Sequence, residues 1–250
     1  MIEVYPLTIT QAEFKTAPER ERLFYLKLGV IANEVSALNK LSLFSLNQSD
    51  DRMVTKRASS ALAMLWLRLL AGRLYEAHDV ITTGYNPLKL AYRSDMKREG
   101  GTISYRKLNA YFVDPNNLVK AVRHKLAFHT DDTVFKTGEQ MMDFDEDIVD
   151  YMCQQRGNTL FWGGEAALVY AVRHLAGDSD AETTFSKLLG ETSSVAGHVN
   201  NFAYAFGLSF FHRNFPEKLV AMESEKIEIT DAVDLAEFSL PWFFEPPSET

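Results

Sequence analysis

The fold is decided by the stretch Ala61-Leu62-Ala63-Met64-Leu65-Trp66-Leu67-Arg68-Leu69-Leu70. Every residue in it except Arg68 is apolar, so a helix built from it is apolar on nearly every face. Such a helix is usually buried at the centre of a protein. We therefore expect a long buried helix that starts near Asp50 or Asp51 and runs to about Ile81.

Helical signals recur along the rest of the chain. Thr16 can cap a helix and Pro18 suits its first turn, and apolar residues then recur at helical spacings as far as Leu41. Further helices are predicted near 86–100, 104–112, 114–130, 149–155, 165–175, 181–189 and 193–211, with one short strand near 226–229. The pattern predicts an all-α multi-helix bundle with long N-terminal helices and at most a minor β element near the C-terminus.

The C-terminal end is less regular than the rest of the chain. Pro216 follows the last long predicted helix, and Pro241 interrupts the tail. We expect a helical domain over residues 1–215 and a C-terminal extension over residues 216–250 that packs on it. The aromatic run Trp242-Phe243-Phe244 is suited to docking on the chain itself or on a partner.

Composition and charge exclude several classes of protein. A hydrophobic content of 46% in 250 residues is too high for a disordered chain and suits a large core. The formal net charge of −8 is not that of a protein that coats nucleic acid, although a local basic patch is compatible with it. The single cysteine, Cys153, excludes an internal disulfide and fits a reducing compartment.

Neither a secretory signal nor a membrane-spanning segment is visible. Residues 1–16 lack a basic start followed by an apolar run. The strongest apolar run, residues 58–70, is too short for a bilayer core of about 30 Å, which takes roughly 20 apolar residues. We therefore expect a cytoplasmic protein that does not enter the membrane.

The clearest candidate for chemistry is Arg123-His124-Lys125-Leu126-Ala127-Phe128-His129, near the end of the helix predicted to start at Asp114-Pro115. Each helical residue advances by about 100°. On that helical wheel one apolar stripe is formed by Leu118, Val119, Val122 and Leu126. His129 falls on the stripe and Arg123 at its edge, whereas His124 faces away. An acid–base group beside a fixed cation is what cleavage of a phosphodiester requires.

This stretch resembles the motif of the HEPN superfamily. In that motif an arginine, a polar residue and then a histidine, four to six positions after the arginine, stand late in an all-helical domain. Here His124 supplies the polar residue, and five residues separate Arg123 from His129. The resemblance covers these seven residues and their helical context.

The resemblance implies a metal-independent endoribonuclease, in the manner of a toxin or defence effector, whose two motifs face each other across a homodimer. It implies that His129 assists the transfer of a proton, either from the ribose 2′-hydroxyl or to the leaving oxygen. Arg123 would stabilise charge at the phosphorus, and His124 would shape or polarise the pocket. RNA is then the substrate and DNA is not, a neutralising protein is a possible partner, and neither a cofactor nor a metal is expected.

Similar basic pairs occur elsewhere in the chain. Arg73 and His78 also match the spacing, but Leu74 stands where the motif prefers a polar residue. Arg173-His174 and His212-Arg213 stand at predicted helix ends, where cations complement the helix dipole. We interpret all three pairs as structural.

Metal and phosphate-loop signatures are missing from the sequence. Asp143, Asp145 and Asp147 begin like a calcium loop, but Ile148 occupies the position that needs glycine, so this acidic run is interpreted as solvated surface. Cys153 has no partner cysteine, which argues against a zinc site. No glycine-rich phosphate-binding fingerprint occurs.

Three functions remain open from the sequence. The first is the HEPN-like ribonuclease. The second is a non-catalytic all-α interaction or scaffold protein, in which the motif stabilises a helix end or a dimer interface. The third is a helical module that binds a small ligand beside an aromatic helix face formed by Phe202, Phe206, Phe210 and Phe211. Packing in the core or against a partner helix explains that face better than base stacking, because few basic residues interleave it.

Overall fold

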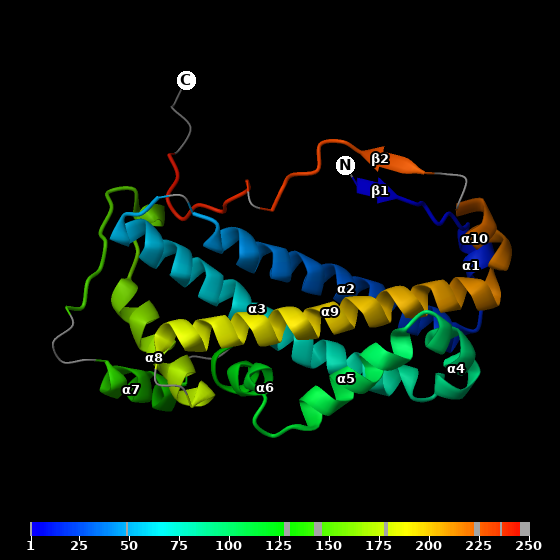
Figure 1. Ribbon diagram of the computed structural model, residues 1–250, viewed down its shortest axis with the longest axis horizontal. Helices are drawn as coiled ribbons and strands as arrows, with labels where there is room; N and C mark the ends of the chain where they lie inside the picture. The colour runs from blue at the N-terminus through cyan, green and yellow to red at the C-terminus, as the bar shows by residue number, and fades with distance from the viewer. Residues whose placement is uncertain are drawn as a thin grey trace. The chain divides into compact units, whose positions relative to one another are not determined.

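The computed structural model describes residues 2–48, 50–127, 131–142, 147–177, 180–222, 226–235 and 237–245 (Figure 1). Its elements are β1 (Ile2–Val4), α1 (Gln11–Phe14), α2 (Glu19–Leu46), α3 (Met53–Tyr85), α4 (Lys89–Arg98), α5 (Gly101–Val113), α6 (Leu118–Val122), a π-helical turn (Arg123–Ala127), α7 (Asp132–Met141), a 3₁₀ turn (Arg156–Asn158), α8 (Trp162–Ala176), α9 (Ala181–Asn214), α10 (Pro216–Met222) and β2 (Ile227–Ile229). The all-α class is therefore confirmed.

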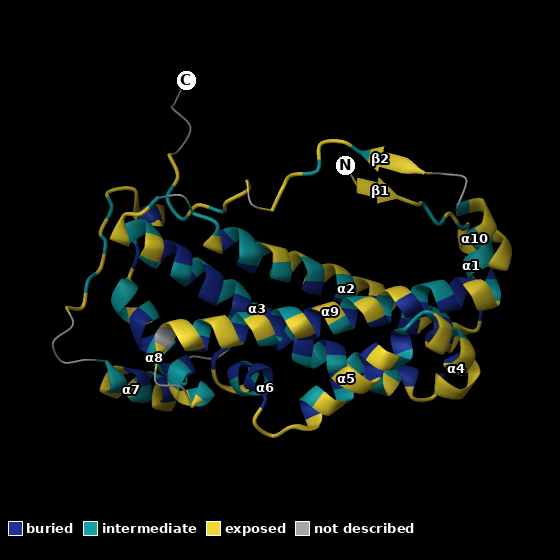
Figure 2. Cartoon of the chain, viewed as in Figure 1, coloured by how far each residue is buried: buried dark blue, intermediate teal, exposed yellow. Residues whose placement is uncertain are grey.

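The described part of the chain contains one small sheet, which has two short strands. β1 and β2 pair antiparallel, with Ile2 opposite Ile229 and Val4 opposite Ile227. Both strands are largely exposed (Figure 2). The minor β element expected near the C-terminus is thus present, and its partner is the N-terminal strand, which the sequence pattern did not predict.

The apolar helix α3 is buried along its length, as expected from its composition. Seven of its residues have no exposed surface: Ala63, Leu67, Leu70, Ala71, Leu74, Ala77 and Ile81. Figure 2 shows this burial as the dark residues that recur along α3. Removing large apolar side chains from water is the main favourable contribution to folding, so α3 contributes a large share of the core.

The chain divides into two compact units. The first contains residues 1–36, 73–115 and 194–233, and the second contains residues 37–72, 116–193 and 234–250. Helices α2, α3 and α9 each contribute residues to both units. The predicted organisation into residues 1–215 and 216–250 stays a prediction.

Aromatic side chains of α9 form the core of the first unit. Four phenylalanines in the part of α9 that belongs to this unit are at most 2% exposed: Phe202, Phe206, Phe210 and Phe211. Phe206 packs edge-on against Phe24 of α2 at 4.6 Å, and Phe210 stacks on Tyr25 at 4.7 Å between ring centroids. Aromatic pairs at these distances stabilise a core beyond the area that they bury. The aromatic helix face is therefore used for core packing.

A buried polar network joins α2, α4 and α9 in the same unit. The hydroxyl of Tyr92 donates to the carboxylate of Glu21, which is 6% exposed. Asn214 Nδ2 donates to Glu21 Oε2 at 3.2 Å, and Arg213 Nε lies 3.9 Å from Glu21 Oε1. Burial, and then the hydrogen bond to Glu21, raise the pKa of Tyr92, so its hydroxyl remains a proton donor. The buried carboxylate is thus compensated, as a buried charge must be.

In the second unit, the C-terminal tail packs on the end of α2. Asn47 Nδ2 donates to the carbonyl oxygens of Leu235 and Phe238 at 3.1 and 3.0 Å. The ring of Phe238 packs edge-on against Phe44 at 4.6 Å. In the aromatic run, Trp242 and Phe243 pack against Ala58, Ala61 and Leu160, so the run docks on its own chain, which is one of the two roles expected for it.

Several predicted boundaries were wrong. The segments 181–189 and 193–211 form one helix, α9, because Thr192 is fully buried and its hydroxyl donates to Leu188 O at 2.7 Å instead of breaking the helix. Residues 149–155 are not helical, since Tyr151 forms an isolated antiparallel bridge with Leu160. Helix α7 was not predicted. Asp131 follows the helix that is predicted to end near residue 130, but it is the N-cap of α7 and accepts a hydrogen bond from Thr133 N at 2.8 Å.

None of the described helices is both long enough and apolar enough to cross a membrane.

Helices α7 and α8 approach each other closely at Gly138. A Cβ atom at this position would lie 2.0 Å from the carbonyl oxygen of Ala167 and 3.3 Å from the backbone nitrogen of Ala171. Neither backbone atom can move without shifting α8. The absence of a side chain at Gly138 is therefore what permits this contact.

We predict that Gly138→Ala lowers the free energy of unfolding by about 1–3 kcal/mol, because the added methyl overpacks the contact. Gly190→Ala is the matched control in the same unit, since nothing lies within 4 Å of its Cβ position on α9. That control should leave stability unchanged or raise it by up to about 1 kcal/mol, as alanine favours a helix interior. Urea denaturation followed by circular dichroism measures both, and equal effects would contradict the proposed contact.

Candidate functional site

The motif begins on α6, a short helix whose start differs from the prediction. Asp114 and Pro115 do not open this helix, because Asp114 ends α5 in an extended conformation. Asn117 is the N-cap instead, and its side chain accepts from Lys120 N at 2.9 Å. Glu191 of α9 accepts a hydrogen bond from Leu118 N at 3.3 Å, so two backbone N–H groups in the first turn of α6 have side-chain acceptors.

The apolar stripe predicted beneath the motif is confirmed. Its four residues are at most 2% exposed: Leu118, Val119, Val122 and Leu126. These residues anchor the motif segment in the second unit, while Arg123 is half-buried at the edge and His124 is exposed. The predicted orientations of Arg123 and His124 relative to the stripe are therefore confirmed.

The motif lies on a π-helical turn, Arg123–Ala127, which the sequence did not reveal. Such turns close hydrogen bonds from i to i+5, are rare, and occur frequently at functional sites. Beyond this turn, a helical wheel of 100° per residue no longer predicts the direction of a side chain. The backbone thus departs from regular α-helix at Arg123 and His124, two of the three motif residues.

Arg123 and His124 contact each other through their side chains. Arg123 Nη1 lies 3.5 Å from His124 Nδ1, at the outer limit of a hydrogen bond. Arg123 carries a permanent charge, so it cannot accept the proton that the imidazole exchanges. An arginine that can bind a phosphate oxygen therefore lies next to an exposed imidazole that can exchange a proton.

Positive charge surrounds the imidazole of His124. Partial burial, and then the charges of Arg123, Lys120 and Lys125, lower the pKa of His124 from its ordinary value of 6.5. The side chain is therefore mainly neutral at pH 7, in the form that accepts a proton. Lys125 Nζ lies 3.8 Å from Asp131 Oδ2, a loose and exposed pair that leaves the local field positive.

The third motif residue, His129, lies outside the described residues, which stop at residue 127 and resume at residue 131. Its position relative to Arg123 stays a prediction. Asp143 and Asp145 of the acidic run also lie outside the described residues. In the part of the chain that is described, no group of three or more histidine, cysteine, aspartate or glutamate side chains could hold a metal ion.

Arg73 and His78 have the structural partners expected of them. Arg73 forms ion pairs with Glu34 and, at 2.6 Å, with Glu76. His78 Nε2 lies 3.0 Å from Asn109 Oδ1, and its ring stacks on Phe112 at 4.4 Å. Burial lowers the pKa of His78, so its stabilising effect is complete above pH 6.5 and is lost as the pH falls through the lowered pKa.

The later basic pairs also make contacts within their own units. The guanidinium of Arg173 lies 5.6 Å from the ring of Tyr170 on α8. His212 Nδ1 lies 3.5 Å from Asp95 Oδ1, and Arg213 Nη1 donates to Ala91 O at 3.2 Å. These contacts agree with structural roles at the ends of α8 and α9.

A partly buried charge pair in the second unit was not anticipated. Arg68, the one charged residue in the apolar stretch of α3, interacts electrostatically with Glu165 of α8. Burial raises the pKa of Glu165, while the charge of Arg68 opposes that rise. No hydrogen-bond partner is present for Arg68 Nε or Glu165 Oε2 among the described residues. The charge of Glu165 offsets the energetic cost of placing the cation Arg68 in an apolar helix, and neither residue is part of the motif.

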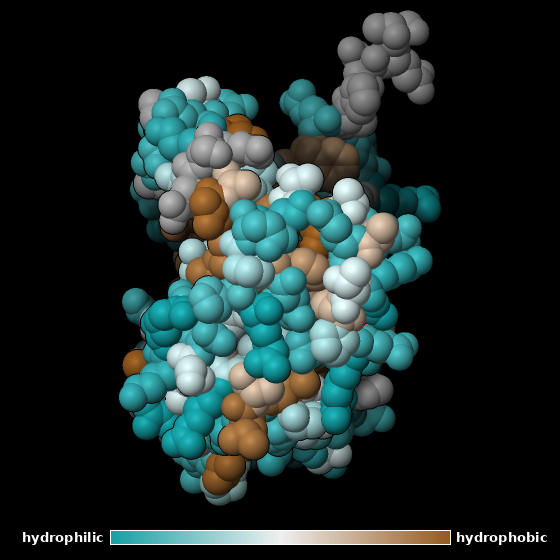
Figure 3. All heavy atoms as spheres, turned by 90° about the vertical axis from the view of Figure 1, so that its right-hand side faces the viewer, coloured by the Kyte–Doolittle hydropathy of each residue, from teal (hydrophilic) through white to brown (hydrophobic). Residues whose placement is uncertain are grey.

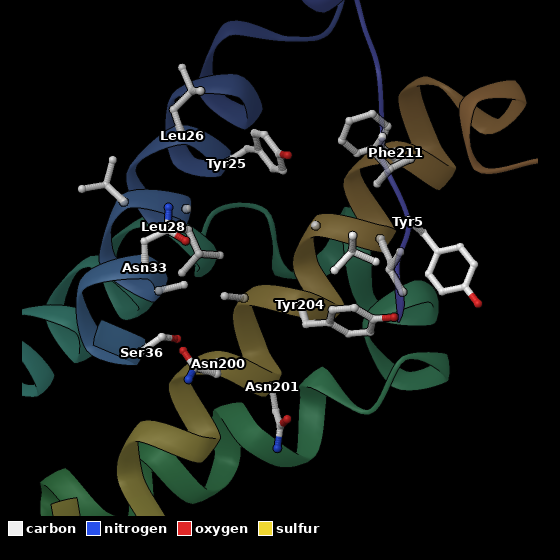
Figure 4. A pocket seen from close by; sticks show the side chains of 18 of the residues that line it. Tyr5, Tyr25, Leu26, Leu28, Asn33, Ser36, Asn200, Asn201, Tyr204 and Phe211 are labelled. Carbon is white, nitrogen blue, oxygen red and sulfur yellow. The ribbon is translucent and has the colours of Figure 1, made fainter. Parts of the chain in front are cut away.

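A groove of about 960 Å³ lies between α2 and α9 of the first unit, beside the N-terminal strand (Figure 4). In Figure 4, α2 contributes Tyr25, Leu26, Leu28, Asn33 and Ser36, and α9 contributes Asn200, Asn201, Tyr204 and Phe211. The buried Asn200 Oδ1 has no hydrogen-bond partner in the described part of the chain. Apolar surface dominates the rest of the lining, so the groove has little means of holding a charged ligand.

Comparison with known proteins identifies no relative: no family model, no curated protein sequence and no solved structure matches the chain.

We predict that Arg123→Gln raises the pKa of His124 toward 6.5, because it removes a positive charge beside the imidazole. NMR titration of the histidine side chains measures this pKa directly. Lys40→Gln, the same change of charge at an exposed position of α2, is the control and should leave it unaltered. A pKa of His124 that is equally insensitive to both substitutions would show that Arg123 does not act on it.

Proposed function

We propose that this chain is a HEPN-like, metal-independent endoribonuclease that acts in the cytoplasm, as a toxin or defence effector. The observation that carries the proposal is the pair Arg123 and His124, in side-chain contact on a π-helical turn that also contains Lys125, with Lys120 on the preceding helix α6. The resemblance of Arg123–His129 to the family motif supplies the chemistry. The all-helical fold is compatible with it.

In the proposed reaction, the 2′-oxygen of a ribose attacks the adjacent phosphorus. A P–O2′ bond forms, the P–O5′ bond breaks, and the products are a 2′,3′-cyclic phosphate and a 5′-hydroxyl. A histidine takes the proton from the 2′-hydroxyl or gives one to the leaving 5′-oxygen, a role that we assign to His129. Arg123 binds the charged phosphate oxygens as the transition state forms, because a guanidinium matches them in bidentate geometry.

His124 has the supporting role in this proposal. Its neutral imidazole next to Arg123 polarises the pocket without adding a second permanent charge. Lys120 and Lys125 attract the RNA backbone locally, although a net charge of −8 limits general affinity for RNA. We therefore propose cleavage of a restricted set of RNAs, by a homodimer that brings two motifs together and that a partner protein can neutralise.

The second candidate is a non-catalytic interaction or scaffold protein. It is favoured by the position of the basic residues Arg123, His124 and Lys125 directly after α6, where cations stabilise the helix end. Under this alternative, their substitution affects folding or assembly and no RNA is cleaved. RNA cleavage separates the two candidates.

The decisive experiment incubates RNA with the purified chain in excess EDTA and analyses the product ends. Wild type should yield 2′,3′-cyclic phosphate and 5′-hydroxyl ends, and a substrate with 2′-deoxyribose should stay intact. His129→Ala and Arg123→Gln should each lower the rate by about 100-fold or more, as expected for loss of an acid–base group or of a phosphate-binding charge.

The matched controls are Arg173→Gln and His174→Ala, which change an arginine–histidine pair at the end of another helix. Both should keep activity within about twofold, and thermal unfolding should show all four variants folded. If wild type and His129→Ala cleave equally, or if neither cleaves any RNA, the ribonuclease proposal fails.

A further inference from the structure

A cavity of about 550 Å³ lies in the first unit, where α3 ends and α4 and α5 begin. Its lining consists of Tyr85, Asn86, Lys89, Leu90, Arg93, Thr102, Tyr105 and Arg106. Neither Arg123 nor His124 lines it, so its role is independent of whether the motif cleaves RNA. Its volume is that of a small-molecule site, for which about 300–1,000 Å³ is typical.

The charge in this cavity is entirely positive. Lys89, Arg93 and Arg106 line it, and none of the eight lining residues is acidic. None of the three cations forms an ion pair with an acidic residue in the described part of the chain. Lys89 Nζ instead lies 5.1 Å from the ring of Tyr105. All three side chains are exposed, so water weakens the repulsion among these like charges, and an anion that contacts them would remove what remains.

The positive field contrasts with the rest of the chain. The net charge is −8, so acidic residues that could neutralise the cavity are available but are placed elsewhere. Figure 3 views the side of Figure 1 that carries α4, and hydrophilic residues cover most of that face. The helices add to the same field, because α4 and α5 begin without an acidic residue in the first turn or a side-chain cap.

Neutral donors and aromatic surface lie beside the cations. Tyr85 and Tyr105 are buried, and their rings meet edge-on at 5.1 Å. The hydroxyl of Tyr105 donates to Asn86 Oδ1 at 2.6 Å. Burial, and then the neighbouring Tyr105, raise the pKa of Tyr85 to about 12, so this hydroxyl keeps its proton at neutral pH. The cavity therefore offers hydroxyl, amide and aromatic groups beside its positive charges.

We propose that this cavity binds the phosphate group of a nucleotide. Lys89, Arg93 and Arg106 neutralise the phosphate, and two guanidinium groups provide bidentate hydrogen bonds to its oxygens. The tyrosines and Leu90 contact the less polar remainder of the ligand. A carboxylate carries a single charge and would leave two of the three cations uncompensated, whereas a phosphate monoester carries nearly two charges at pH 7.

The test uses the full chain and isothermal titration calorimetry at low ionic strength. The probes are uridine 5′-monophosphate, uridine, inorganic phosphate and a short 2′-O-methyl oligoribonucleotide, which carries no 2′-hydroxyl and so resists cleavage. The monophosphate should bind and should weaken as salt is added, while uridine should not bind. Inorganic phosphate should bind more weakly than the monophosphate, because it lacks the part that contacts the tyrosines.

Two variants locate the site. Arg93→Gln and Arg106→Gln remove exposed side chains, so the fold should be retained, and each should weaken binding of the monophosphate by about tenfold or more. Lys97→Gln is the matched control, since Lys97 is an exposed cation on α4 that does not line the cavity. It should change the affinity by less than about twofold.

Each outcome supports or overturns the site. Binding of the monophosphate that Arg93→Gln and Arg106→Gln weaken and Lys97→Gln does not supports a site for a free nucleotide. Binding of the oligoribonucleotide alone would overturn the proposed site for a phosphate monoester, because each internal phosphate of an RNA chain carries a single charge. Equal affinity for uridine and its monophosphate, equal effects of all three variants, or no binding of any phosphate would overturn it.

Discussion

The burial of α3 is the constraint on which the rest of the structure depends. A helix that is apolar on nearly every face is stable only if apolar side chains of other elements surround it. Because α3 contributes to both units, each unit has to supply such partners. The first unit does so with the phenylalanines of α9, and the charge of Arg68 in the second is offset by Glu165. Other helices are less constrained: Leu23, Leu26 and Val30 of α2 are each about half exposed.

The parts of the fold that follow from local periodicity were predictable. The long helices α2 and α3, the shorter α4 and the buried stripe from Leu118 to Leu126 all followed from apolar spacing. Features set by contacts distant in sequence were not predictable. Strand β1 is defined by its pairing with β2, and α9 continues through Thr192 because burial there outweighs its weak helix propensity.

The same distinction between local sequence and distant contacts applies to the candidate sites. The contact between Arg123 and His124 follows from their adjacency in the sequence, and their orientations follow from the helical wheel. The cationic cavity could not be derived, because α4 and α5 meet through a turn at Gly100. That residue has a φ of +78°, a conformation that glycine adopts without strain. The turn places Arg106 beside Lys89 and Arg93, three cations that carry no recognisable motif.

The π-helical turn at Arg123–Ala127 has a consequence for how this motif is compared between proteins. A turn closed from i to i+5 accommodates one residue more than the α-helical turn it replaces. Counting residues along the chain therefore no longer measures direction around the helix axis, and one extra residue corresponds to a rotation of about 100°. Two chains with the same number of residues between arginine and histidine can thus aim these side chains differently, and chains with different numbers can aim them alike. Alignment by backbone geometry, and not by letter spacing, is the appropriate basis for comparing such segments.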